Sequence, residues 1–163
     1  MNQQGETKKP TAAQARRMRT AARLRAVQAL FAMEAADMAL EAVLEEFETG
    51  RLGAEIDGVR LNEPDVEHFR RLVGEAVARQ AQVDQLTHRA LAARWPIDRI
   101  DPTLRALFRA AGAEFLAADT PPKVTITEYL EIAKAFYPDG KEAKFVNGVL
   151  DHMAREARPA DFA

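Results

Sequence analysis

The chain is 163 residues long and 47% hydrophobic, which suffices for one domain to bury a core without help from disulfides or metals. It contains no Cys and no Ser, so disulfide bonds, thiolate metal sites and Cys or Ser nucleophiles are excluded. The net charge of −2 hides an uneven distribution, because residues 1–25 carry seven of the 23 basic side chains and one of the 25 acidic ones. A basic segment beside an acidic remainder indicates contact with a nucleic acid or another acidic surface.

Apolar residues recur at spacings of three and four along most of the chain, which predicts an all-α fold. Residues 1–11 are polar and contain Gly and Pro, so we expect them to form a disordered tail. We expect helices over residues 12–36 and 38–47, then a glycine-containing loop over residues 49–64. Pro64 is expected to open the third helix.

The second half of the chain begins with a weaker apolar pattern over residues 83–91, which predicts a fourth helix. Asp101 and Pro102 predict the start of a further helix, because Asp accepts hydrogen bonds from free N–H groups and Pro fits the first turn. Thr125 followed by Glu128 predicts a capping box at the start of the next helix.

Two positions near the end of the chain carry specific expectations. Phe136 continues the apolar stripe of the helix that follows Thr125, so we expect it in the core. Gly148 lies in the middle of the last predicted helix, where Gly costs about 1 kcal/mol relative to Ala, so we infer a close helix contact there. Seven or so helices joined by short links predict a compact helical bundle.

The titratable residues form no recognisable catalytic or metal-binding pattern. His68, His88 and His152 fall on three different predicted helices without a second ligand at metal-binding spacing, so we interpret them as partly exposed helix residues. No glycine cluster matches a phosphate-binding loop, and a catalytic carboxylate pair would need a cleft that sequence cannot reveal. We therefore expect no catalytic residues, no metal, no cofactor and no enzymatic activity.

The basic segment forms the first candidate site. Arg16, Arg19 and Arg23 follow three- and four-residue spacing, which places three guanidinium groups along one side of the first predicted helix, with Arg17 beside them. A guanidinium can bind phosphate through two hydrogen bonds and can stack on bases. The alternative is that these arginines pair with acidic residues of the next helix or only keep this end of the chain in water.

A second candidate site stands at the start of the last predicted helix, where Lys141, Lys144 and Phe145 lie together. Free N–H groups at a helix start attract phosphate, and two lysines strengthen that attraction. Phe145 offers a stacking face for an unpaired base, although considered alone its spacing fits core packing better.

No targeting or membrane signal is visible in the sequence. The basic start lacks the apolar run of a secretory signal, and no stretch approaches 18 consecutive apolar residues. A transit peptide or a basic helix lying on a membrane surface remains the alternative for an arginine-rich start. We expect a cytoplasmic protein with no membrane partner.

Four segments together resemble the signatures of the NusB family of bacterial transcription antitermination factors. They occur in the family's order and spacing and span roughly residues 16–156. The segments are RLRAVQALF (Arg23 to Phe31), RIDPTLRALFRAAGAEF (Arg99 to Phe115), TPPKVTITEYLEIAKAF (Thr120 to Phe136) and KFVNGVLDHMA (Lys144 to Ala154).

The resemblance implies a single helical domain over residues 12–158, with packed halves of about 12–81 and 82–158 and a short tail over residues 159–163. Members of the family bind boxA, a short single-stranded RNA signal in ribosomal RNA leaders, jointly with NusE, a small-subunit ribosomal protein. This heterodimer helps elongating RNA polymerase resist termination, which makes the transcription elongation complex a further partner. A monomer and a homodimer both remain open for the free protein.

The resemblance also assigns residues to these partners. Phe31 and Asp98 match the surface that meets NusE, although Phe31 stands where Tyr is frequent and Leu104 where many members carry an acid. Lys141 stands where some relatives carry an acid, which should favour RNA. The residues expected to contact RNA are Arg16, Arg17, Arg19, Arg23, Lys141, Lys144 and Phe145.

Three functions therefore remain in competition on the sequence alone, and the least favoured of them is an enzyme, which would require a cleft with converging carboxylates. The first is an RNA-binding antitermination adaptor without catalytic activity, and the resemblance favours it. The alternative is a helical protein–protein scaffold that does not bind RNA. A titration with boxA RNA separates the adaptor from the scaffold.

Overall fold

The computed structural model describes residues 9–48, 55–56, 59–60, 64–91 and 99–162, and these residues confirm the all-α fold. Within them lie seven α-helices, a hairpin of two-residue strands and a C-terminal 3-10 turn. In chain order the elements are α1 (Ala12–Ala36), α2 (Leu40–Glu46), β1 (Glu55–Ile56), β2 (Val59–Arg60), α3 (Val66–Ala78), α4 (Gln80–Ala90), α5 (Pro102–Ala117), α6 (Pro122–Phe136), α7 (Lys141–Ala157) and η3 (Pro159–Phe162).

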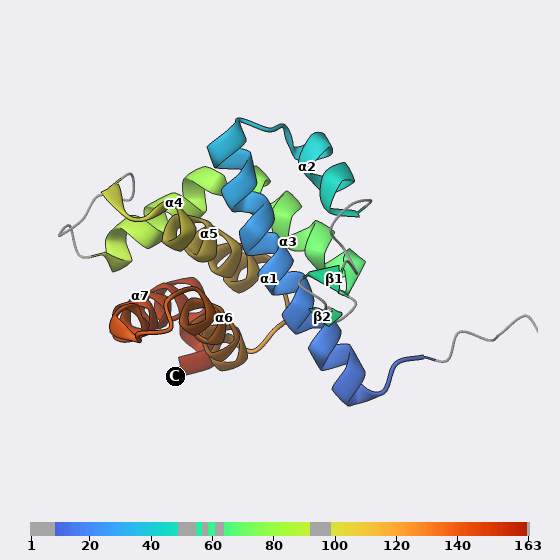
Figure 1. The fold of residues 1–163 in the computed structure, drawn as a ribbon. Coiled ribbons are helices and arrows are strands. Elements are labelled where there is room, and N and C mark those ends of the chain that lie inside the picture. Colours follow the sequence, from blue (N-terminus) through green and yellow to red (C-terminus); the bar gives the residue numbers. More distant parts are fainter. Residues whose placement is uncertain (1–8, 49–54, 57–58, 61–63, 92–98, 163) are drawn as a thin grey trace, which may run out of the picture.

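Helix α5 is the centre of the bundle, and eleven of its 16 residues are buried. It packs against α1, α3, α4, α6 and α7, so it joins the first and second halves of the chain in one core (Figure 1). The predicted division into two halves stays a prediction. Many of the buried α5 residues are Ala, whose small side chains let the surrounding helices approach closely.

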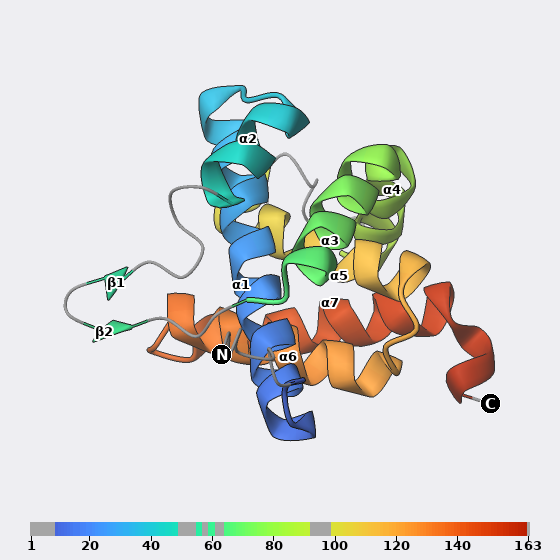
Figure 2. The same ribbon diagram turned by 90° about the vertical axis from the view of Figure 1, so that its right-hand side faces the viewer.

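Helix α1 runs along the whole bundle. Its C-terminal end lies beside α2 at the top of the molecule, and its N-terminal half passes α6 at the opposite end (Figures 1 and 2). Helix α6 lies between the N-terminal half of α1 and α7 (Figure 1). The two predicted RNA-binding segments, at the starts of α1 and α7, are therefore separated by α6.

The helix starts are capped partly as the sequence predicts. The side chain of Asp101 accepts a hydrogen bond from the N–H of Thr103 at 2.7 Å, which confirms the predicted start of α5. Helix α3 is capped by Asp65 instead of being opened by Pro64. The predicted capping box at Thr125 is wrong, because α6 already begins at Pro122 and Thr125 is buried inside it.

A capping box does occur at the start of α1, although none was predicted there. The N–H of Gln14 donates to the hydroxyl of Thr11 at 3.1 Å, and the N–H of Thr11 donates to the Gln14 side chain at 2.8 Å. This reciprocal pair fixes the first turn of the helix that carries the arginines. Of the rest of the expected tail, residues 9–10 are exposed and without secondary structure, and residues 1–8 lie outside the described residues.

Two other segments differ from the expected loop and tail. The expected loop over residues 49–64 contains the antiparallel pair β1 and β2, in which Glu55 pairs with Arg60. The expected tail over residues 159–163 forms η3 through residue 162, and the guanidinium of Arg155 lies 4.7 Å from the ring centroid of Phe162. Phe162 is partly buried and packs against the core.

The close helix contact inferred for Gly148 occurs at a different glycine. A Cβ atom at Gly148 would meet no atom within 4 Å, and this position is exposed. A Cβ atom at Gly112 in α5 would lie 2.5 Å from Cγ1 of Val83 in α4. Gly112 is therefore the residue that permits two helices to approach.

Replacing Gly148 by Ala and replacing Gly112 by Ala should change the free energy of unfolding in opposite directions. Gly148→Ala should raise the free energy of unfolding by about 1 kcal/mol, because Ala favours the helix and its methyl group meets open space. Gly112→Ala should lower it by about 1–2 kcal/mol, because the stiff side chain of Val83 blocks the methyl group. Urea unfolding with unchanged m-values measures both effects. Changes of the same sign in the two free energies of unfolding would contradict the assignment of the close helix contact to Gly112.

Candidate nucleic-acid interface

Three of the four predicted arginines lie at the surface of the N-terminal half of α1. Arg16 and Arg17 are exposed and Arg19 is half-buried. Among the described residues, no carboxylate lies within ion-pair distance of these three guanidinium groups. They follow the positive end of the α1 dipole, so this end of the helix presents uncompensated positive charge.

The fourth arginine, Arg23, is not available to an RNA surface, and this corrects the sequence-based prediction. Its side chain is 2% exposed and forms a forked pair with Glu114 of α5. The Nε of Arg23 donates to Oε1 of Glu114 at 2.9 Å, and its Nη2 donates to Oε2 at 2.8 Å. The alternative of an internal ion pair is therefore the correct one for Arg23, although its partner lies on α5 and not on the next helix.

Glu114 is the centre of a wider buried network. The hydroxyl of Tyr129 on α6 donates to Oε1 of Glu114 at 3.1 Å, and Nε2 of His68 on α3 lies 3.6 Å from the same oxygen. Burial of Glu114 raises its pKa, but His68 and Arg23 outweigh this effect and lower the pKa to about 2. Glu114 thus remains charged and ties together α1, α3, α5 and α6.

This network also fixes how α1 lies against its neighbours. Nη1 of Arg23 lies 3.5 Å from Oε1 of Glu128 on α6, and the hydroxyl of Thr20 donates to the same carboxylate at 3.0 Å. On another side, the N–H of Asp65 donates to the carbonyl of Met18 at 2.9 Å. The segment that carries Arg16, Arg17 and Arg19 is therefore held on two sides while its arginines remain in solvent.

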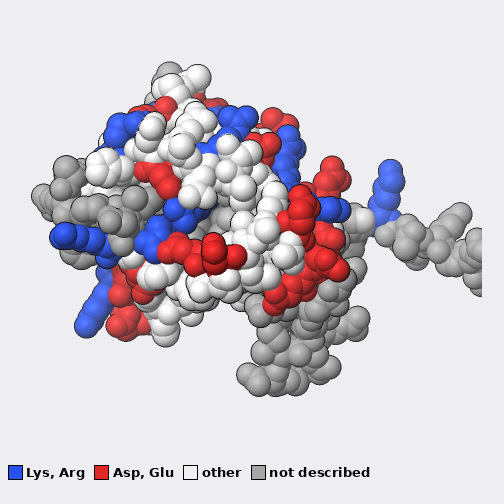
Figure 3. Space-filling model, turned by 90° about the horizontal axis from the view of Figure 1, so that it is seen from above, with Lys and Arg blue, Asp and Glu red and all other residues white. Residues whose placement is uncertain are grey.

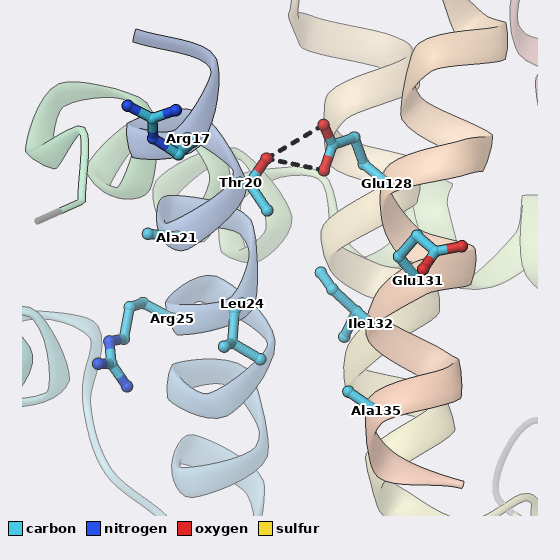
Figure 4. Close-up of a pocket in the computed structure, with 9 residues that line it drawn as sticks. All are labelled: Arg17, Thr20, Ala21, Leu24, Arg25, Glu128, Glu131, Ile132 and Ala135. Atoms are coloured by element: carbon cyan, nitrogen blue, oxygen red, sulfur yellow. Dashed lines mark hydrogen bonds between the residues drawn. The ribbon is translucent and has the colours of Figure 1, made fainter. Parts of the chain in front are cut away.

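A groove of about 300 Å³ lies between α1 and α6. Leu24 of α1 and Ile132 of α6 face one another across it, and the Thr20–Glu128 hydrogen bonds close one end (Figure 4). We call it the α1–α6 groove, and its lining residues are Arg17, Thr20, Ala21, Leu24, Arg25, Glu128, Glu131, Ile132 and Ala135. The sequence carried no signal for it, because it depends on how two distant helices cross.

The second candidate segment is located as predicted, at the start of α7. Lys141 and Lys144 are exposed, and among the described residues neither is within ion-pair distance of a carboxylate. Gly140 precedes the helix in the left-handed conformation with φ of 76°, which favours Gly at this turn. Phe145 is half-buried and packs edge-to-face on Phe108, with ring centroids 6.4 Å apart, so only part of its ring faces solvent.

Phe136 provides a more exposed ring near the same place. The sequence pattern placed Phe136 in the core, but its side chain is 38% exposed at the last turn of α6. It lies one helical turn beyond Ile132, which lines the α1–α6 groove. The prediction for Phe136 is wrong, because this residue ends α6 and its ring is not covered there by the core.

The predicted partner-binding residues are only partly described. Phe31 is 39% exposed on α1, as a docking residue would be, whereas Asp98 lies outside the described residues. Leu104 stands where the resemblance leads one to expect an acid. Its side chain is buried, so this difference does not leave an apolar side chain on the surface.

An ion network lies close to Phe31. Glu34 accepts hydrogen bonds from both Arg105 and Arg109, and Arg109 also pairs with Asp84 of α4 at 2.9 Å. The hydrogen bond from Arg105 lowers the pKa of Glu34. These residues border a hollow of about 580 Å³ between α1, the α3–α4 junction and α5. The charges here are paired, in contrast to those at the start of α1.

A group of acidic side chains lies far from the start of α1. Acidic side chains gather over α2, at the end opposite to the start of α1 (Figures 1 and 3). Helix α2 contributes the exposed or half-buried residues Glu41, Glu45 and Glu46. A polyanion would be repelled at that end and attracted at the other.

Neither a metal site nor a membrane-spanning helix is found in the described part of the chain. Among the described residues, no group of three or more His, Cys, Asp or Glu side chains is arranged to hold a metal ion. None of the described helices combines the length and apolar character needed to cross a bilayer. Of the three histidines, His68 is only 12% exposed in its side chain and belongs to the Glu114 network, whereas His88 and His152 are exposed.

Comparison with known proteins identifies the class of protein that has this fold and charge pattern. The model of the NusB family matches residues 20–155. The transcription antitermination protein NusB of Granulibacter bethesdensis is 46% identical over 90% of this chain and 93% of its own length. The corresponding protein of Maricaulis maris is 44% identical, with 90% and 91% covered. The chain therefore belongs to the NusB family.

Solved structures agree with this assignment. NusB of T. maritima has a TM-score of 0.69 and 31% identity, and the match covers 96% of this chain and 99% of that one. A crystal structure of the antitermination factors NusB and NusE in complex with double-stranded RNA gives a TM-score of 0.67 and 26% identity, covering 86% and 98%.

Removing one member of the buried pair should destabilise the fold strongly. Glu114→Gln should lower the free energy of unfolding by about 3–5 kcal/mol, because the buried Arg23 guanidinium loses its forked partner and keeps only Glu128, at 3.5 Å, as a counter-charge. The double variant Arg23→Met with Glu114→Leu should recover most of this loss, because it removes both charges together. Urea unfolding measures the effect, and a loss below about 1 kcal/mol for Glu114→Gln would show that the pair is not a structural tie.

The same pair should make stability depend on acid pH. The pKa of Glu114 falls from 4.5 to about 2 on folding, so the unfolded chain binds this proton first as pH decreases. The stability contributed by the charged carboxylate is present above about pH 4.5 and is lost as pH falls towards 2. The difference in unfolding free energy between the wild type and Glu114→Gln should therefore shrink over this range. A constant difference would contradict the assigned pKa.

Proposed function

We propose that this protein is an RNA-binding transcription antitermination factor that acts jointly with NusE. The observation that carries the proposal is the set of exposed and half-buried arginines at the start of α1, which have no acidic partner among the described residues, in a chain of the NusB family. The similarity to a solved complex of NusB and NusE with double-stranded RNA supports RNA and NusE as partners. In this role the protein contributes a rigid basic surface and no catalysis.

The proposed RNA surface consists of two basic segments on either side of α6. Arg16, Arg17 and Arg19 form one segment, and Lys141 and Lys144 form the other. Phosphate contacts from these side chains would supply affinity and position the RNA, whereas base contacts would supply sequence preference. Phe145 remains a contact residue through the exposed part of its ring, and Arg23 is removed from the set.

We infer that the RNA is the single-stranded boxA signal of ribosomal RNA leaders. Unpaired bases can be contacted on their edges and faces by a protein surface, whereas the edges in an RNA duplex are difficult to reach. The bound factor would then help elongating RNA polymerase resist termination. From this inference we expect the protein to bind boxA at least tenfold more tightly than a duplex of the same sequence.

NusE is proposed to dock near Phe31, away from the RNA-binding start of α1. Phe31 is an exposed aromatic side chain on the C-terminal half of the same helix, and Asp98 stays part of the proposed surface. Because one helix carries both surfaces, NusE and RNA can be held in a fixed relative position without competing for the same residues.

Binding of RNA should depend strongly on salt concentration. If the five cations named above contact five phosphates, a plot of log K against log salt concentration should slope by about −3.5 for a single strand. Fluorescence anisotropy with labelled boxA RNA, in the presence of NusE, measures this slope. A flat dependence would favour the alternative of a protein–protein scaffold that does not bind RNA.

Replacing Arg16, Arg17 and Arg19 together by Ala should weaken RNA binding and reduce the slope by about 2. Thermal unfolding should stay nearly unchanged, because these side chains are at the surface and have no ion pair among the described residues. Arg79→Ala serves as a control, because Arg79 is an exposed arginine at the end of α3. A large loss of stability in the triple variant, or an equal loss of binding in the control, would count against the proposed surface.

A further inference from the structure

We propose that the α1–α6 groove receives one unstacked base of the bound RNA, and that Glu128 selects a base that carries an exocyclic amino group. This inference rests on the proposed RNA-binding function and adds to it a site of base recognition. The groove lies beside the arginine-bearing segment, and Arg17 belongs to both. A strand whose phosphates bind Arg16, Arg17 and Arg19 would therefore bring its bases to the mouth of the groove.

The walls of the groove suit the two faces of a base. Leu24 on α1 and Ile132 on α6 lie on opposite sides, and Ala21 and Ala135 add small apolar groups (Figure 4). Unpaired RNA bases are commonly bound with their faces against flat or apolar side chains and their edges against polar groups. The volume of about 300 Å³ is at the lower limit of ligand pockets, which fits a single base better than a larger ligand.

The polar group at one end of the groove is a fixed hydrogen-bond acceptor. The hydroxyl of Thr20 donates to Glu128 at 3.0 Å, and Arg23 lies 3.5 Å from the same carboxylate, so two residues of α1 hold its position. A hydroxyl supplies only one proton, whereas a carboxylate has about four acceptor positions. Glu128 is 23% exposed in its side chain, so acceptor positions remain open to a ligand.

An acceptor at this place distinguishes between bases. The amino group of cytosine can donate to a carboxylate, whereas uracil has a carbonyl oxygen at the same ring position and would be repelled. Cytosine and uracil have nearly the same size, so apolar packing in the groove would not separate them. Selection would therefore depend on Glu128.

The lining of the groove holds two arginines and two glutamates, and the basic segments on either side of it favour a nucleic acid over a basic peptide as its occupant. Arg16 and Arg19 flank the segment that carries Arg17, and Lys141 and Lys144 follow shortly after the end of α6 in the chain. A polyanionic strand could contact both groups of cations with its phosphates, whereas a basic peptide would be repelled by them. The exposed ring of Phe136, one turn beyond Ile132, extends the apolar surface for a neighbouring base.

The test compares labelled 12-nucleotide oligo(rC) and oligo(rU) in fluorescence anisotropy titrations, with NusE present. The wild type should bind oligo(rC) about tenfold more tightly, which is the expected effect of one hydrogen bond to a charged acceptor. Glu128→Gln should reduce this ratio to about one or two, mainly by improving the binding of oligo(rU), because the amide can donate to a carbonyl oxygen. Glu41→Gln is the matched control on α2, where the same loss of charge should leave the ratio unchanged.

A second variant tests, independently of Glu128, whether the base binds in the α1–α6 groove. Ala135→Phe should fill the groove and remove the preference between the two oligonucleotides, while the salt dependence stays because the phosphate contacts remain. Thermal unfolding of both variants checks that the fold is intact.

Each other result would overturn the inference. Equal wild-type affinities for the two oligonucleotides, or a preference that survives either variant, would show that the groove does not select the base. Loss of NusE binding by Ala135→Phe, with the preference unchanged, would assign the groove to a protein partner. If the wild type binds no single-stranded RNA at all, the proposed function fails together with the inference. Salt-dependent binding without a preference between oligo(rC) and oligo(rU) would contradict the inference alone.

Discussion

The structure depends on one buried ion pair, between Arg23 of α1 and Glu114 of α5. Replacing such a pair with well-packed apolar residues is often neutral or stabilising, so its presence does not imply a large net gain in stability. Its effect lies in geometry, because a forked pair with Tyr129 and His68 beside it is satisfied only when four helices meet in one arrangement. The position of α1 against α5 and α6 is therefore fixed by charge as well as by packing.

The consequences for function follow from this position. The same helix that is tied to the core through Arg23 presents Arg16, Arg17 and Arg19 to solvent one and two turns earlier. Because the segment is rigid and capped at Thr11, its guanidinium groups need little reordering to meet phosphates. The acidic surface of α2 lies at the opposite end of the molecule, which would orient an approaching RNA before contact (Figures 1 and 3).

Periodicity was sufficient to predict the helices, and the capping signal at Asp101 and Pro102 predicted the start of α5, whereas the capping box expected at Thr125 misplaced the start of α6. The site was less predictable, because the exposure of an arginine depends on what another helix places beside it. Arg23 and Arg19 look alike in sequence, but only Arg23 faces Glu114, which lies 91 residues later in the chain. An acid inside the otherwise apolar α5 pattern was the one available signal for this pair. The α1–α6 groove and the exposure of Phe136 depend on helix crossings and helix ends, which periodicity does not describe.

The arginine Nε–Hε resonances in NMR spectra recorded with and without boxA RNA and NusE would test this account most directly. The Nε–Hε signal of Arg23 should be protected from solvent exchange in the free protein and should not move when RNA is added, because it is bound to Glu114. The signals of Arg16, Arg17 and Arg19 should exchange rapidly at first and should shift or broaden on RNA binding. An exchanging, RNA-sensitive signal from Arg23, or three exposed arginines that do not respond, would contradict the account.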